Sequence, residues 1–162
     1  PFEFVISRTF DAPRDLVWKA FTEGERMMHW WGPKGFTTPS VKVDLRPGGV
    51  CHYQLKSPEG QEMWGKLVYR EIVPQERLVF IVSFSDEKQM ITTHPLNPNW
   101  PREILSTVTF AEQNGKTTMT VRWTAHNATD VERKTFEDGR ESMHMGWTGT
   151  LDQLAAYLAQ VR

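Results

Sequence analysis

The stretch from Met143 to Leu158, close to the C-terminus, constrains the possible folds more than any other part of this chain. On a helix, where each residue turns by about 100°, five of its apolar side chains fall within about 80° of one another. The five are Met143, Trp147, Leu151, Leu154 and Leu158. Because a run of predicted strands precedes it, such a helix is expected to lay this apolar stripe against a sheet.

The two ends of the stripe differ in character. Met143 and Trp147 lead with long, bulky side chains, and compact leucines follow. A helix in a tightly packed interior more often uses leucine throughout, whereas methionine suits an irregular or adaptable cavity. The pattern therefore favours a cavity at the Met143–Trp147 end, with an ordinary filled core as the alternative.

The first thirty residues predict one strand and two short helices. Residues 2–10 alternate as a half-buried strand does. A helix is then expected to open at Asp11-Ala12-Pro13, with Asp11 as its N-cap and Pro13 in its first turn. A second short helix is predicted over Glu25 to Trp31, where Gly32-Pro33 stops it.

Turn motifs rich in Pro and Gly divide the middle of the chain into further strands. These strands are predicted over residues 39–46, 49–56, 61–72, 77–86, 103–111 and 116–125. Asn114-Gly115 is the strongest hairpin signal. Thr129-Asp130-Val131-Glu132 reads as a capping box that starts a helix near 130. That helix is expected to run to about 160, with a possible break at Gly139.

This order of elements predicts an α+β fold in a single domain spanning residues 1–162. Short connections imply a mostly antiparallel sheet of about seven strands. Such a twisted sheet curls, and the long C-terminal helix fits into its concave face.

The composition and charge of the chain argue against some classes of binding partner. The chain of 162 residues has 19 Lys and Arg against 20 Asp and Glu, a net charge of −1, and no run of basic residues. Nucleic acid and membrane surfaces are therefore not expected as partners.

No apolar run approaches the length of a membrane span and no signal-like start is seen, so a cytoplasmic location is expected. Cys51 is the single cysteine, which excludes an internal disulfide.

Motifs for metal binding, cofactor binding or catalysis are not found. Glu141 and His144 form one Glu-x-x-His pair, whereas a di-iron site needs two such pairs on facing helices. His52, His94 and His126 have no partner at ligand spacing. The sequence also has no Gly-x-Ser-x-Gly elbow and no glycine-rich phosphate loop ahead of a helix. No catalytic residue, metal or cofactor is therefore assigned.

Strand alternation gathers large side chains on the face that meets the helix. Tyr53, Met63, Phe84 and Trp123 share that face and oppose the leading end of the helical stripe. So many long side chains on one concave face either fill it or line a pocket. The candidate ligand-binding residues are Trp31, Tyr53, Met63, Phe84, Trp123, Arg140, Met143 and Trp147.

Arg140 is the one charged member of this set. If the last helix is unbroken through Gly139, Arg140 projects between Trp147 and Leu151 and could bind a carboxylate or phenolate of a ligand. If Gly139 resets the helical phase, Arg140 is instead solvated.

The connection from Asp86 to Arg102 is unusually long and contains three prolines and Trp100. Long loops in compact domains are usually functional or disordered. Its apolar residues, notably Met90 and Trp100, could cover the cavity entrance as a lid; a flexible excursion between strands is the alternative.

Several motifs in order resemble one known family. They are Asp11-Ala12-Pro13, Trp30-Trp31-Gly32-Pro33, Asp44-Leu45-Arg46-Pro47-Gly48-Gly49, Pro58-Glu59-Gly60 and Gly146-Trp147 followed by Leu151-Asp152-Gln153-Leu154. Together they resemble the activator of heat-shock-protein-90 ATPase homologue-like branch of the START/Bet-v-type (SRPBCC) superfamily. The resemblance spans nearly the whole chain and implies a helix-grip fold with a hydrophobic cavity.

The resemblance leaves three functions open, because members of one superfamily serve many. The first is binding of a small hydrophobic ligand in the cavity without catalysis. The second is a polyketide cyclase- or hydrolase-like enzyme, which would need acid and base residues in the cavity. The third is a chaperone-interacting module linked to the stress response, although the domain that engages the chaperone in the eukaryotic activator is not part of the match.

Overall fold

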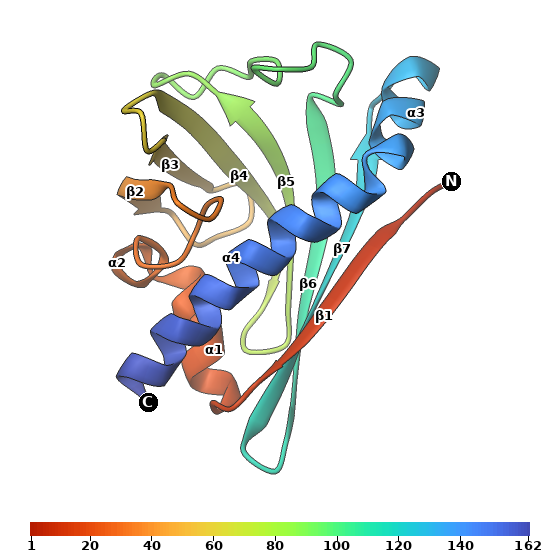
Figure 1. The fold of residues 1–162 in the computed structure, drawn as a ribbon. Coiled ribbons are helices and arrows are strands. Elements are labelled where there is room, and N and C mark those ends of the chain that lie inside the picture. The colour runs from red at the N-terminus through yellow and green to blue at the C-terminus, as the bar shows by residue number, and fades with distance from the viewer.

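The computed structural model describes the whole chain, Pro1 to Arg162, and its seven strands form one antiparallel sheet in the order β1-β7-β6-β5-β4-β3-β2 (Figure 1). The strands are β1 (Phe4–Phe10), β2 (Thr37–Val43), β3 (Val50–Lys56), β4 (Glu62–Val73), β5 (Arg77–Ser85), β6 (Glu103–Gln113) and β7 (Lys116–His126). The helices are α1 (Arg14–Thr22), α2 (Gly24–Met27), α3 (Asp130–Asp138) and α4 (Arg140–Val161). This arrangement is the predicted α+β helix-grip fold.

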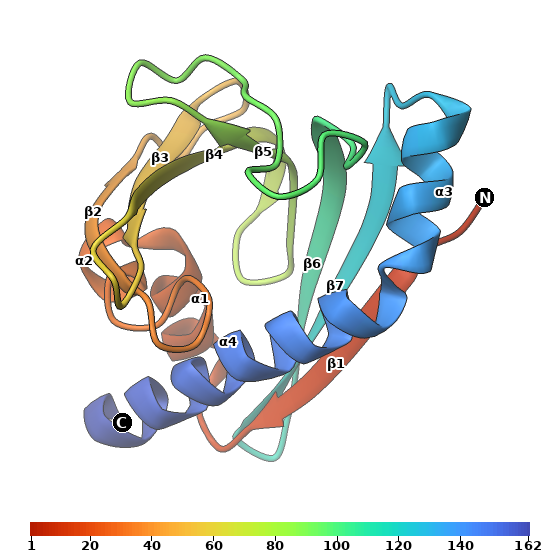
Figure 2. The same ribbon diagram turned by 45° about the horizontal axis from the view of Figure 1, so that its top comes forward.

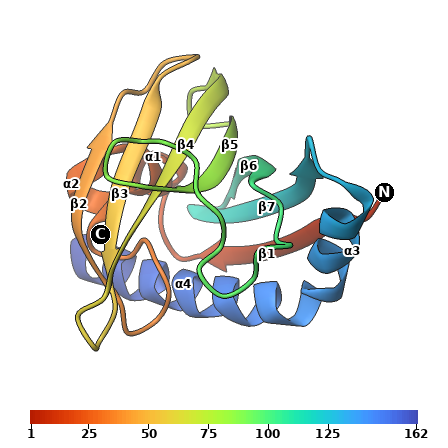
Figure 3. The same cartoon turned by 90° about the horizontal axis from the view of Figure 1, so that it is seen from above.

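The sheet curves around α4, which crosses its concave side (Figures 1 and 2). Seen from above, β2 to β5 and β6, β7 and β1 rise as two walls with α4 along the bottom (Figure 3). Strand alternation decides which side chains face the helix. On β3, for example, Cys51, Tyr53 and Leu55 are all buried. Tyr53 and Leu55 also line the space between the sheet and α4, as strand alternation predicts for β3.

The local signals at the end of the sheet are also confirmed. Asn114 and Gly115 both have positive φ angles, 55° and 78°, as the two central residues of a type I′ hairpin turn require. The next helix, α3, begins with the predicted capping box. The Thr129 hydroxyl accepts from the Glu132 amide, and the Glu132 carboxylate accepts from the Thr129 amide.

The start of α1 differs from the prediction. Pro13 is the N-cap, and the helix has no side-chain cap. The Asp11 carboxylate lies two residues too early and forms an ion pair with Arg162 at the end of α4 instead. Asp11 therefore holds the last helix to the β1–α1 junction rather than capping α1.

The second helix is shorter than predicted. It ends at Met27, and hydrogen-bonded turns continue from there to Trp31. The amide of Trp30 bonds to Met27, three residues back, as in a 3₁₀ turn. Both tryptophans are buried, and the Trp30 indole donates to the carbonyl of Ala20 in α1. The two indoles contact each other edge-on, at 5.5 Å between centroids, and both pack against Phe21 of α1.

The predicted C-terminal helix is divided at Gly139, which ends α3 and precedes α4. A Cβ atom at Gly139 would lie only 3.0 Å from the ring of Trp100. The chain bends here, and the space a side chain would occupy is used by Trp100.

Two kinds of contact hold α4 in the sheet. Leu151, Leu154 and Leu158 are almost completely buried, which contributes on the order of 2 kcal/mol each. Thr150 and Gln153 donate hydrogen bonds of 2.9 Å to the carbonyl of Gly32, whose φ of +115° turns that carbonyl toward the helix. The helix is thus fixed to both the core and the turn before β2.

We expect Cys51 to be unreactive in the native protein. Its thiol is fully buried, and burial raises the pKa of the thiol to about 12, so almost no thiolate forms at pH 8. Labelling with a chromogenic disulfide reagent should be negligible in buffer and complete in denaturing urea. Rapid labelling of the folded protein would contradict the burial of this strand.

Candidate functional site

A cavity of about 530 Å³ lies between the concave face of the sheet and the first half of α4. Its wall is contributed by β3, β4, β5, β6, β7, α4 and the segments before β2 and β6. The apolar lining residues are Trp31, Pro33, Phe36, Tyr53, Leu55, Met63, Val82, Phe84, Pro95, Leu96, Trp100, Pro101, Ile104, Trp123, Met143 and Trp147. A cavity of this size and character suits a small apolar molecule.

The position of the cavity agrees with the difference between the two ends of the apolar stripe on α4. Met143 and Trp147 line it, whereas Leu151, Leu154 and Leu158 belong to the buried core. The cavity thus lies at the end of the helix where the sequence favours one. Gly146 is on the same face of α4 and also lines the cavity.

Three tryptophans form a continuous wall. The ring of Trp147 lies edge-on to Trp31, at 6.0 Å between centroids, and to Trp123, at 5.6 Å. Trp31 in turn meets the ring of Tyr53 at 5.6 Å. These edge-to-face arrangements are favourable contacts that hold the rings in fixed positions.

Tyr53 reaches its place because Gly65, its partner on β4, has no side chain. A Cβ atom at Gly65 would lie 2.4 Å from the Tyr53 hydroxyl oxygen. Burial raises the pKa of this hydroxyl, while the adjacent Trp31 indole partly opposes the shift through a hydrogen bond. Tyr53 is therefore a neutral phenol at physiological pH.

The polar groups of the cavity are few and carry no fixed charge. No Asp, Glu, Lys or Arg is among the lining residues. The Trp123 indole donates to the Ser106 hydroxyl at 2.9 Å, and the Thr150 hydroxyl donates to Gly32. A charged ligand would thus lose its hydration without gaining an ion pair, which disfavours it.

His94 is the single lining residue whose ordinary pKa lies near neutrality. Its Nδ1 accepts a hydrogen bond of 2.9 Å from the Leu96 amide, and its ring meets Phe84 edge-on at 5.0 Å. Burial lowers the pKa of His94 below its ordinary value of 6.5. The ring is therefore neutral at pH 7, with its proton on Nε2.

In the view from above, the β5–β6 loop, residues 86–102, passes on the near side of β3, β4 and α4 (Figure 3). His94, Pro95, Leu96, Trp100 and Pro101 contribute to the lining. Trp100 joins the loop to the helical side, since its ring lies 5.5 Å from Phe136 of α3 and 6.0 Å from His94. The loop has the position that the sequence suggested for a lid.

Two of the predicted site residues lie elsewhere. Met90 is 65% exposed and does not line the cavity, because Asp86 accepts the amides of Lys88 and Met90 in a turn away from it. Arg140 does not line the cavity either: it is the first residue of α4, on the same unbroken helix as Trp147, and its guanidinium is 5.4 Å from the centroid of the Phe2 ring, beside the start of β1.

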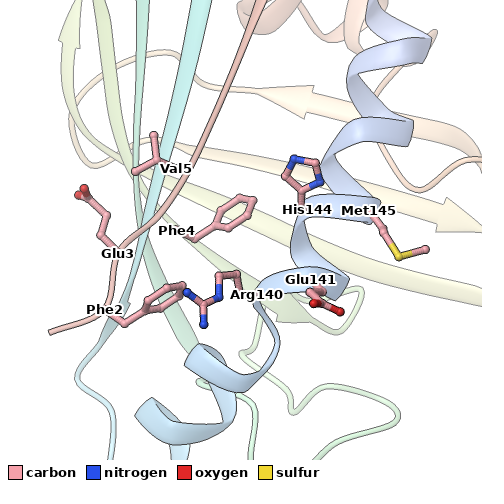
Figure 4. Close-up of a pocket in the computed structure, with 8 residues that line it drawn as sticks. All are labelled: Phe2, Glu3, Phe4, Val5, Arg140, Glu141, His144 and Met145. Carbon is pink, nitrogen blue, oxygen red and sulfur yellow. The ribbon is translucent and has the colours of Figure 1, made fainter.

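Arg140 instead borders an open hollow of about 560 Å³ between the start of β1 and the outer side of α4 (Figure 4). Glu3, Glu141 and His144 also border it, so this surface is mixed in charge. Glu141 and Met145 point away from β1 (Figure 4). The hollow is a surface depression with eight lining residues, against 23 around the cavity.

The other seven predicted ligand-binding residues all line the cavity: Trp31, Tyr53, Met63, Phe84, Trp123, Met143 and Trp147. The sequence analysis did not assign Leu55, Val82, Gly146 and His94. Leu55 and Val82 share strand faces with Tyr53 and Phe84, so alternation could have found them. Gly146 and His94 left no such signal.

No group of three or more His, Cys, Asp or Glu side chains is arranged to hold a metal ion. None of the four helices combines the length and apolar character needed to cross a membrane.

Replacing Trp100 with alanine should loosen the β5–β6 loop, because its contacts with Phe136 and His94 are lost. Hydrogen exchange of residues 86–102 should speed up about tenfold, with a smaller change in the free energy of global unfolding. Met90→Ala, in the same loop but exposed, is the control and should change neither. Equal exchange in the two variants would show that Trp100 does not hold the loop.

The titration of His94 should follow from its burial. Because burial lowers the pKa of His94, its imidazole binds a proton more readily when the loop is open than when it is closed. Acidification below pH 6.5 should therefore favour opening of the loop, and this effect should vanish above pH 6.5. A charged ring also cannot accept the Leu96 amide at Nδ1. An NMR titration of the imidazole should give a pKa below 6.5, and a value above it would contradict this environment.

The sequence and structural similarities to known proteins agree with this geometry. A family model described as activator of Hsp90 ATPase homolog 1-like protein matches residues 11–159. No curated protein matches the chain.

Solved structures share the fold over nearly the whole chain. A Nitrosomonas europaea protein is 26% identical with a TM-score of 0.76, covering 98% of this chain and 94% of its own. An Arthrobacter aurescens protein is 21% identical with a TM-score of 0.81, covering 98% and 86%. The AHSA1 protein of Silicibacter pomeroyi is 18% identical with a TM-score of 0.75, covering 99% and 100%. The chain therefore belongs to the activator of Hsp90 ATPase homolog 1-like family, with the helix-grip fold of the SRPBCC superfamily.

Proposed function

We propose that this protein binds a small, uncharged hydrophobic molecule between the sheet and α4. The observation that carries the proposal is the cavity of about 530 Å³ with an aromatic and aliphatic lining and no charged side chain. An apolar molecule placed there gains about 25 cal/mol for each Å² of apolar surface removed from water.

The rigidity of one cavity wall favours a binding site over a gap left by imperfect packing. Trp31, Trp123 and Trp147 hold one another edge-to-face, so the cavity cannot close by rotation of a single ring. The α4 helix that carries Trp147 is fixed by the bonds of Thr150 and Gln153 to Gly32. A preformed site of this kind binds without a large cost of ordering.

An enzyme of the cyclase or hydrolase type has less support. Acid–base catalysis requires groups with matched pKa values within hydrogen-bond reach of the substrate. The lining offers His94 and the phenol of Tyr53, and neither has a carboxylate beside it in the cavity.

A chaperone-interacting module also has less support here. Most of the large exposed apolar side chains lie on separate segments, as Met28, Leu45, Val131 and Val161 do, and two, Val5 and Met145, border the same surface hollow. A protein-binding surface would gather them into a larger patch. The family description alone names this role.

Filling the cavity tests the proposal. A Cβ atom at Gly146 meets no other atom within 4 Å, and the residue lines the cavity. Gly146→Leu should therefore occupy cavity space while improving the helical propensity of α4 by roughly 1 kcal/mol. We expect the neutral dye N-phenyl-1-naphthylamine to bind the native protein saturably and to quench its tryptophans, with affinity at least about tenfold lower in Gly146→Leu.

The matched control places the same leucine on the other side of the helix. Met145 is 74% exposed and does not line the cavity, so Met145→Leu should bind the dye as the native protein does. Circular dichroism and thermal unfolding would verify that both variants fold. Absence of saturable binding to the native protein, or unchanged binding to folded Gly146→Leu, would refute the proposal.

A further inference from the structure

Several polar groups in the cavity have no protein partner: the buried hydroxyl of Ser83, which can donate or accept, and three ring N–H groups, which can only donate. The Trp123 indole is already bonded to Ser106, and the Trp31 indole is occupied by the Tyr53 hydroxyl. The indole N–H groups of Trp100 and Trp147 donate to no protein atom, and neither does Nε2 of His94. No carboxylate lines the cavity, so no charged acceptor of the protein competes for these donors.

His94 is the best positioned of these donors. The Leu96 amide occupies Nδ1, which fixes the tautomer and leaves the N–H at Nε2. The ring is held from two further directions, edge-on to Phe84 at 5.0 Å and to Trp100 at 6.0 Å. The donor is therefore prearranged, and a ligand pays little to order it.

We infer that His94 selects the ligand: the cavity takes an apolar molecule bearing one uncharged hydrogen-bond acceptor, such as a carbonyl oxygen, which receives the Nε2–H of His94. This inference rests on the proposed function and adds the chemical class of the ligand. A hydrocarbon would leave the imidazole donor unpaired beside it, whereas a ketone of the same shape satisfies it. An anion gains no ion pair, since no cation lines the cavity.

A pair of isosteric probes tests this assignment. 2-Acetylnaphthalene and 2-isopropenylnaphthalene have nearly the same shape and differ in a C=O against a C=CH₂ group. Their affinities are measured at pH 8 by displacement of N-phenyl-1-naphthylamine. The ratio of the two affinities, compared between variants, cancels the difference in their hydration in water.

Three substitutions of His94 separate the donor from its surroundings. His94→Phe keeps the aromatic packing against Phe84 and Trp100. His94→Asn keeps an acceptor for the Leu96 amide, as Asn97 does for the Asn99 amide at 3.0 Å. Both remove the Nε2 donor, whereas His94→Gln restores an N–H donor at a similar reach.

The preference for the ketone should fall roughly three- to tenfold in both His94→Phe and His94→Asn. It should recover in His94→Gln and remain unchanged in Trp147→Phe, which removes the indole donor instead. The infrared carbonyl band of the bound ketone should lie at lower wavenumber in the native protein than in His94→Phe.

Two results would overturn the assignment in different ways. If both probes bind but the preference is unaffected in His94→Phe, or is lost only in Trp147→Phe, His94 is not the selecting donor and the proposed function stands. If neither probe binds the native protein, the proposed function fails and this inference fails with it.

Discussion

The attachment of α4 to the turn before β2 is the interaction on which the rest of the structure depends. Gly32 adopts a φ of +115° and presents its carbonyl to Thr150 and Gln153. A Cβ atom at this position would lie 2.9 Å from a terminal methyl group of Leu55, which can move aside, so the positive φ is what favours glycine here. Together with the buried leucines beyond it, this contact fixes how close the helix approaches the sheet. The cavity is the space that remains at the other end of the helix.

The aromatic residues have two roles that depend on this placement. Toward the C-terminal half of α4, rings such as Phe21 and Phe80 fill the core without leaving space for a ligand. Toward its N-terminal half, Trp31, Trp123 and Trp147 meet edge-on and support one another around a space. Edge-on contacts also occur in the filled core, as between Phe21 and Phe110, so the space at the other end depends on where the rings lie and not on how they meet. The same composition therefore gives a solid core at one end and a cavity at the other.

The polar character of the site depends on which of its polar groups already form hydrogen bonds within the protein. Ser106 and Tyr53 account for two indoles, and the Leu96 amide accounts for one nitrogen of His94. What remains for a ligand is a small number of donors in an uncharged apolar wall. Because an unsatisfied buried donor costs more than a satisfied one gains, such a wall discriminates among ligands of equal size by their acceptors.

The sequence by itself determined the α+β helix-grip fold, the seven strands, the inward strand faces and the end of α4 at which the cavity lies. These features rest on local periodicity and turn chemistry, which act over a few residues. Tertiary structure alone decided the position of Arg140, which starts α4 and lies against the ring of Phe2, a residue far away in the sequence. It likewise turned Met90 outward and brought His94 into the cavity wall. A long loop without periodic pattern takes its conformation from the surfaces it meets, and those surfaces exist only once the sheet and helices have assembled.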